Sequence, residues 1–60
     1  MDRQYDIFEK LPGGYVLWRE TIVGRQESLS RLGVLATATR NEIYAIHLPT
    51  KEIIATLNKK

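Results

Sequence analysis

The chain contains no cysteine and only one histidine among its 60 residues. Without cysteine it can form neither disulfides nor thiolate metal sites. His47 alone supplies too few ligands for a self-contained zinc site. We therefore expect no metal and no cofactor. The absence of cysteine is also typical of proteins in the reducing cytoplasm.

Long hydrophobic runs are absent as well. No stretch approaches the roughly 20 apolar residues that a membrane-spanning helix needs. Residues 1–4 are polar and lead directly into a strand pattern, so they do not have the character of a signal peptide. We expect a cytoplasmic protein that does not associate with membranes.

The chain has little excess charge. Nine lysines and arginines stand against seven acidic residues, which gives a net charge of +2. Two of the nine are the C-terminal Lys59 and Lys60, and removing them leaves seven against seven. Such a balance indicates an ordinary solvated surface, not a basic stripe for nucleic acid.

Groups that could carry catalysis are few. Gly13 and Gly14 form a turn pair, not a phosphate-binding loop. Ser28 and Ser30 fall in a helical segment that contains no histidine. His47 could act as a general base or as a pH switch in an interface, but no second catalytic partner is visible near it in the sequence. We favour a structural role for it and predict that the protein is not an enzyme.

Turn signals divide the chain into four strands and one helix. Residues 5–11 and 15–23 have strand character and are separated by Pro12-Gly13-Gly14, which predicts a β-hairpin. Residues 25–39 have helical spacing. Residues 42–48 and 52–58 form a second hairpin around a turn at residues 49–51. The sequence thus predicts one α+β domain over residues 1–60, with a two-layer ββαββ order and one helix packed on a four-stranded sheet.

The strand order is left open by the sequence. A helical crossover makes the second and third strands parallel, with a right-handed passage. These two strands are either neighbours or separated by the first or the fourth strand.

The helix shows an apolar stripe of Leu29, Leu32 and Ala36, flanked by Leu35 and Gly33. A glycine facing the sheet would let the helix backbone approach closely. No strong side-chain cap precedes the helix, and Asn41 suits the left-handed residue that ends one.

Apolar residues lie on both faces of the predicted strands. In residues 15–23, strict alternation places Val16, Trp18 and Ile22 on one face and Tyr15, Leu17 and Val23 on the other. In residues 52–58, Ile54 points away from Ile53, Ala55 and Leu57. A sheet that is wet on one side normally alternates apolar with polar residues.

One helix is too narrow to cover such a sheet. A helix is about 10–12 Å wide, whereas four strands about 4.8 Å apart span nearly twice that. The uncovered face is expected to carry apolar interface anchors, and a second copy of the chain is the simplest partner. We therefore predict a non-enzymatic, self-associating interaction or assembly module, a dimer or higher oligomer. Its predicted anchors are Phe8, Trp18, Tyr44, Ile46 and Ile54.

Two other classes of function compete with this prediction. Trp18-Arg19 could form a stacking platform with a neighbouring cation in a nucleic-acid-binding or transcription-related module. Neighbouring strand residues point to opposite faces, however, which weakens that interpretation. The basic residues available to it are Arg19, Arg25, Arg31, Arg40 and Lys51. A third class is a small-molecule binder that uses His47 in a cleft between subunits.

Several short segments resemble a group of short bacterial proteins of unknown function. They are Tyr5-Asp6-Ile7-Phe8-Glu9, Leu17-Trp18-Arg19, Gly24, Leu32 with Leu35-Ala36, Asn41-Glu42 and Ile53-Ile54-Ala55. The resemblance extends over nearly the whole chain. It implies no activity or cofactor, and it implies that the chain is a complete, free-standing protein.

Overall fold

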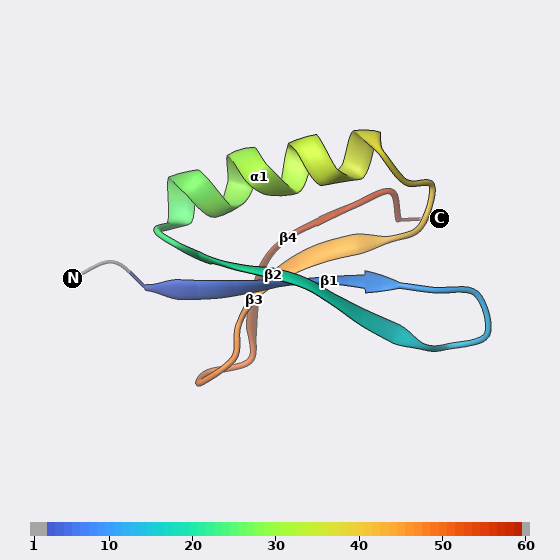
Figure 1. Ribbon diagram of the computed structural model, residues 1–60. Coiled ribbons are helices and arrows are strands. Elements are labelled where there is room, and N and C mark those ends of the chain that lie inside the picture. The colour runs from blue at the N-terminus through green and yellow to red at the C-terminus, as the bar shows by residue number, and fades with distance from the viewer. Residues whose placement is uncertain (1–2, 60) are drawn as a thin grey trace.

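Two β-hairpins joined by one helix make up the fold, as Figure 1 shows. The computed structural model describes residues 3–59 and confirms the predicted ββαββ order. The elements are β1 (Gln4–Lys10), β2 (Val16–Val23), α1 (Arg25–Thr37), β3 (Ile43–His47) and β4 (Glu52–Leu57). Gly13 and Gly14 both have positive φ angles in the first hairpin turn, a conformation that glycine adopts without steric cost.

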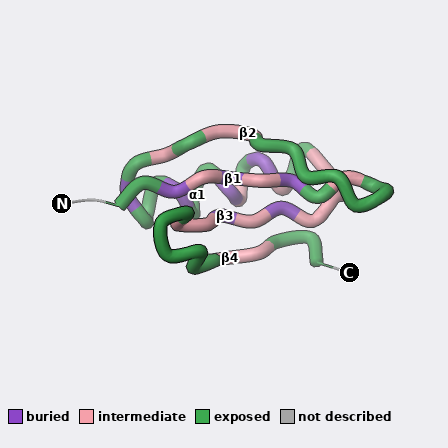
Figure 2. The backbone as a smooth tube through the Cα atoms, turned by 90° about the horizontal axis from the view of Figure 1, so that it is seen from below, coloured by how far each residue is buried: buried purple, intermediate pink, exposed green. Residues whose placement is uncertain are grey.

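The sheet has the strand order β2-β1-β3-β4, and all neighbours are antiparallel. Figure 2 shows this order from below, with α1 behind the sheet. Since β2 and β3 are each antiparallel to β1, they run parallel to one another with β1 between them. This is one of the arrangements that the sequence left open.

Both edge strands contain a β-bulge. Between Ile7 and Phe8, the register of β2 skips Arg19, and between Ala45 and Ile46 the register of β4 skips Ile54. The two bulges lie in one row across the sheet, because Ile7 and Ala45 are themselves paired. A bulge puts two residues opposite one, so the residues after it change faces relative to strict alternation.

The bulges correct the predicted faces of Ile22 and Val23 in β2 and of Ile53 and Ile54 in β4, and they put Val23 and Ile53 on the face turned away from the helix. Ile22 was expected on the same face as Trp18, but it packs against the core beneath the helix. Ile54 was expected on the face opposite Ala55, but both pack against the same core cluster. Each error arises because strict alternation does not allow for the extra residue.

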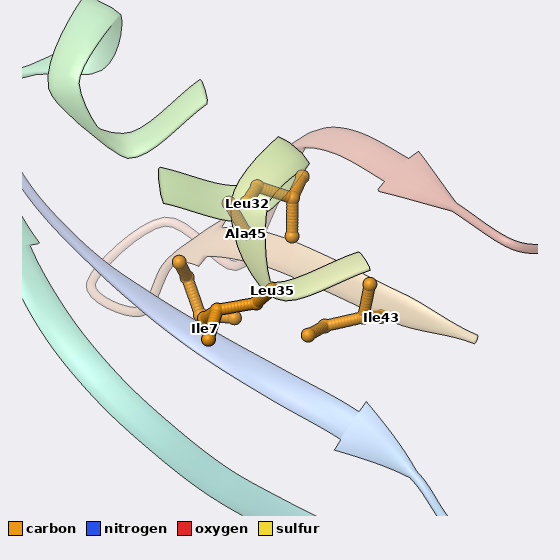
Figure 3. Close-up of a cluster of buried hydrophobic side chains, with 5 residues drawn as sticks. All are labelled: Ile7, Leu32, Leu35, Ile43 and Ala45. Atoms are coloured by element: carbon orange, nitrogen blue, oxygen red, sulfur yellow. The ribbon is translucent and has the colours of Figure 1, made fainter. Parts of the chain in front are cut away.

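The core lies between α1 and the two central strands. Figure 3 shows Leu32 and Leu35 of α1 above side chains of β1 and β3. The buried cluster consists of Ile7, Leu32, Leu35, Ile43 and Ala45.

The helix is rotated relative to the predicted stripe. Leu29 remains 37% exposed, whereas Ser28 is fully buried. Ser28 can occupy this position because its hydroxyl donates a hydrogen bond of 2.7 Å to the Gly24 carbonyl oxygen, which satisfies the buried polar group. A Cβ added at Gly33 would meet nothing within 4 Å, so the expected close approach of the helix backbone is wrong.

The start of the helix agrees with the prediction, whereas its C-terminal end does not. As predicted, no side chain caps the start, where Gly24 has a φ of 100°. The helix ends at Thr37, two residues earlier than predicted, and the Ala38 amide donates to the Leu35 carbonyl. Asn41 does not have the left-handed conformation that would end a helix.

Candidate interaction surface

The sheet face turned away from α1 is called the open face below. Directly paired residues of adjacent strands share a face, so the register defines its membership. One row across the sheet runs Trp18, Phe8, Tyr44 and Thr56, and the next runs Thr21, Asp6, Ile46 and Ile53. Lys10 and Val16 lie beyond the first row and form a further pair. Within residues 3–59, α1 is the only helix, and it packs on the opposite face.

Aromatic side chains occupy the middle of the open face. The rings of Phe8 and Tyr44 are stacked, with centroids 5.9 Å apart and planes at 25°. Lys10 Nζ lies 5.8 Å from the Tyr44 centroid. Trp18 is paired with Phe8 on the other side and is 54% exposed. Aromatic rings in such a row are the usual anchors of protein interfaces.

A carboxylate holds the indole of Trp18 in place. Asp6 Oδ1 accepts a hydrogen bond of 3.1 Å from Trp18 Nε1 and another from the hydroxyl of Thr21. Both donors come from β2, one from each row. This hydrogen bond favours one orientation of the indole, and such preorganisation lowers the entropy that binding costs.

Four of the five predicted anchors lie together on this face. Phe8, Trp18, Tyr44 and Ile46 occupy adjacent register positions. Ile54 does not join them, because the β4 bulge turns it toward the core. Ile53 takes its place on the open face and is 52% exposed. Trp18 and Ile53 are thus exposed, whereas Phe8, Tyr44 and Ile46 are half-buried.

The opposite face contains a buried polar cluster that the sequence did not suggest. Glu9 is only 4% exposed and accepts hydrogen bonds of 2.7 Å from both Thr39 Oγ1 and Asn41 Nδ2. The guanidinium of Arg19 also donates to it. These interactions connect β1, β2 and the segment after α1. Arg19 points to this side because it follows Trp18, which lies on the open face, and neighbouring strand residues point to opposite faces.

The environment of Glu9 stabilises its charged form. Hydrogen bonds from Thr39 and Asn41 hold the pKa of the Glu9 carboxyl below its ordinary value of 4.5, against the raising effect of burial, and Arg19 adds to the lowering. A carboxylate with this many donors is a poor proton acceptor at neutral pH. We therefore assign the cluster a structural role.

A shallow pocket of about 310 Å³ lies at the end of the sheet beside this cluster. Several of its polar groups already have partners in the chain. Lys10 Nζ lies 3.1 Å from Glu42 Oε2 across the pocket, and Asn58 Nδ2 donates to the carbonyl oxygens of Ala36, Thr39 and Asn41. These contacts tie the C-terminal strand to the end of the helix and bring no reactive groups together.

His47 lies at the other end of β3, on the helix side of the sheet with Tyr5. The two ring centroids are 5.8 Å apart, and His47 Nδ1 lies 2.9 Å from Thr50 Oγ1. Across the strands His47 is paired with Glu52. In the described part of the chain, no group of three or more histidines and carboxylates could hold a metal ion.

Ion pairs engage part of the predicted basic set. Arg19 is paired with Glu9, and Arg31 is paired with Glu20, which raises the pKa of the Arg31 guanidinium through its hydrogen bond and charge. Arginines committed in this way are less available for phosphate contacts.

Comparison with known proteins adds no relationship: no family model, no curated protein and no solved structure matches this chain. Across residues 3–59, no helix combines the length and the apolar character needed to cross a membrane.

Proposed function

We propose that this chain is a non-enzymatic interaction module that associates with further copies of itself through the open face. The observation that carries the proposal is that aromatic and aliphatic side chains lie side by side in two rows across that face. The single helix packs on the other face and leaves these rows uncovered. A domain of 60 residues buries only about 60% of its unfolded surface on folding, so self-association would also supply stability that the monomer lacks.

The area of the open face is sufficient for an interface with a second copy of the chain. Four strands about 4.8 Å apart, each about 20 Å long, give roughly 400 Å² in projection for each copy. Two stacked faces would bury about 800 Å² in projection and more in accessible area. Specific interfaces begin at about 1,000 Å² in total, so the face is large enough for a modest dimer.

The edges of the sheet are less suited to association. Arg19 in β2 and Ile54 in β4 are bulged residues on the two edge strands. Bulges at sheet edges hinder the addition of a further strand from another molecule. Association through the face is therefore favoured over edge-to-edge pairing.

Sedimentation equilibrium over a micromolar concentration range tests the proposal. We expect a concentration-dependent dimer or higher oligomer of the 6.9 kDa chain. Trp18→Ala should weaken association about 30-fold, which corresponds to about 2 kcal/mol for an aromatic anchor. Val34→Ala is the matched control, since Val34 is 57% exposed but lies on the helix. A strictly monomeric chain would refute the proposal.

A further inference from the structure

The open face of β1 has a charge order that complements itself. Four residues of β1 lie there at every second position, and the last three of them are Asp6, Phe8 and Lys10. An acid and a base thus stand at equal distances on either side of an aromatic ring. Alternate residues are about 6.7 Å apart, so the two charges lie about 13 Å from one another along the strand.

Face-to-face packing of two copies allows two simple directions for the symmetry axis, both lying between the sheets. An axis along the strands would stack Asp6 over Asp6 and Lys10 over Lys10. An axis across the strands at Phe8 would instead reverse β1 and place Asp6 of each copy over Lys10 of the other. Only the second arrangement brings opposite charges together, and like charges opposed in an interface are costly.

Both charged groups retain bonding capacity for such a contact. The donors from Trp18 and Thr21 both use Oδ1 of Asp6, and no group in residues 3–59 donates to its Oδ2. The Lys10 ammonium has three N–H groups, and its ion pair with Glu42 does not exhaust them. A carboxylate placed in the middle of a buried face would be strongly unfavourable without a counter-charge.

We propose that two copies pack with β1 antiparallel to β1 across the interface, about a two-fold axis along the Trp18–Phe8–Tyr44 row. This inference rests on the proposed self-association and adds its geometry. Asp6 and Lys10 then form two intermolecular ion pairs, one on each side of the axis. Each of the three aromatic residues of the row then lies against the same residue of the second copy. Aligned sheets pack about 10 Å apart with strands within about 30°, which this arrangement allows.

Charge reversal tests the geometry. In Asp6→Lys the pairs become lysine against lysine, and in Lys10→Asp they become aspartate against aspartate. Each variant alone should dimerise at least about tenfold more weakly than the original chain, because every dimer contains two such pairs. An equimolar mixture of the two variants should form a heterodimer close to the original affinity, since both of its pairs are again opposite in sign.

The outcomes separate this inference from the proposal beneath it. If the original chain dimerises but Asp6→Lys dimerises equally well, or the mixture does not recover, the antiparallel geometry is wrong and self-association stands. If the original chain is a monomer at every concentration, both fail. Circular dichroism of each variant checks folding.

A second pair of variants covers a folding defect in Asp6→Lys. Lys10→Glu should dissociate the dimer, because the introduced carboxylate would oppose Asp6 of the second copy. Adding Asp6→Asn should restore part of the affinity, since the asparagine oxygen can still accept from Trp18 while the repulsion is removed. No recovery in the double variant would count against the ion pair.

Discussion

The two faces of the sheet differ in whether their carboxylates are paired with a cation of the same chain. On the covered face, the carboxylate of Glu9 receives Arg19, Thr39 and Asn41 from its own chain. On the open face, Asp6 receives two neutral donors and no cation from the described chain. The buried carboxylate of the covered face is therefore neutralised within one molecule, whereas Asp6 on the open face stays unneutralised beside the exposed Trp18 and the half-buried Phe8. This difference is the physical reason for expecting a second copy on the open face.

Substitutions at two adjacent residues of β1 are expected to have the largest effects and to test this contrast between the faces. Ile7 is fully buried beneath the helix, and Phe8 points to the open face. Ile7→Ala should cost about 2–5 kcal/mol of folding free energy through the cavity it leaves. For a domain of this size such a loss would largely unfold the chain.

Phe8→Ala is the comparison for Ile7→Ala. It should leave the folded monomer largely intact and weaken association, because its ring contributes mainly to the open face. Thermal unfolding followed by circular dichroism at low concentration measures the first effect, and sedimentation measures the second. Equal destabilisation of the monomer by both variants would contradict the division between the faces.

Removal of Arg19 should have an intermediate effect. Arg19→Ala takes away the cation that pairs with Glu9, which keeps its bonds to Thr39 and Asn41. We expect a loss of about 1–3 kcal/mol in unfolding free energy, typical of a buried group that loses one partner. Urea titration measures it. Arg25→Ala is the control, since Arg25 is an exposed residue at the start of the helix.

The same cluster predicts a pH dependence of monomer stability. The folded pKa of Glu9 is lowered from 4.5, so its contribution is fully present above that pH. It is lost as the pH falls from 4.5 through the folded pKa, because the unfolded state then binds more protons than the folded state. Glu9→Gln should flatten the stability curve below about pH 5. An unchanged acid slope in Glu9→Gln would show that other carboxylates control it.

The sequence was sufficient for the order of elements and for the faces of the central strands. Phe8 of β1 and Tyr44 of β3, both predicted on the uncovered face, lie on the open face, next to the buried Ile7 and Ile43 that point to the core. Proline and glycine located the first hairpin turn. These signals are local, which is why they can be read from neighbouring residues alone.

The edge strands and the helix stripe could not be predicted in the same way. A bulge leaves no distinctive residue type, so nothing marked Ile54 as a residue of the covered face. Hydrophobicity favoured Leu29 over Ser28 for the buried side of α1, but the Ser28 hydroxyl bonds to the backbone and can be buried. The cluster around Glu9 depends on contacts between residues far apart in the sequence, and such contacts have no local signal.

The smallest expected effect comes from the helix, outside both faces. A Cβ at Gly33 meets nothing within 4 Å, and this glycine lies in the interior of α1. Gly33→Ala should therefore raise the free energy of unfolding by up to about 1 kcal/mol, because alanine loses less conformational entropy in a helix. Gly24→Ala should act in the opposite direction, since Gly24 has a φ of 100° that alanine adopts only with strain. Neither variant touches the open face, so the dimer dissociation constant, measured where the monomer is folded, should stay the same in both. A change in that constant with Gly33→Ala would mean that the stability of the covered side and the association of the open side are coupled, and the two faces would then not be independent.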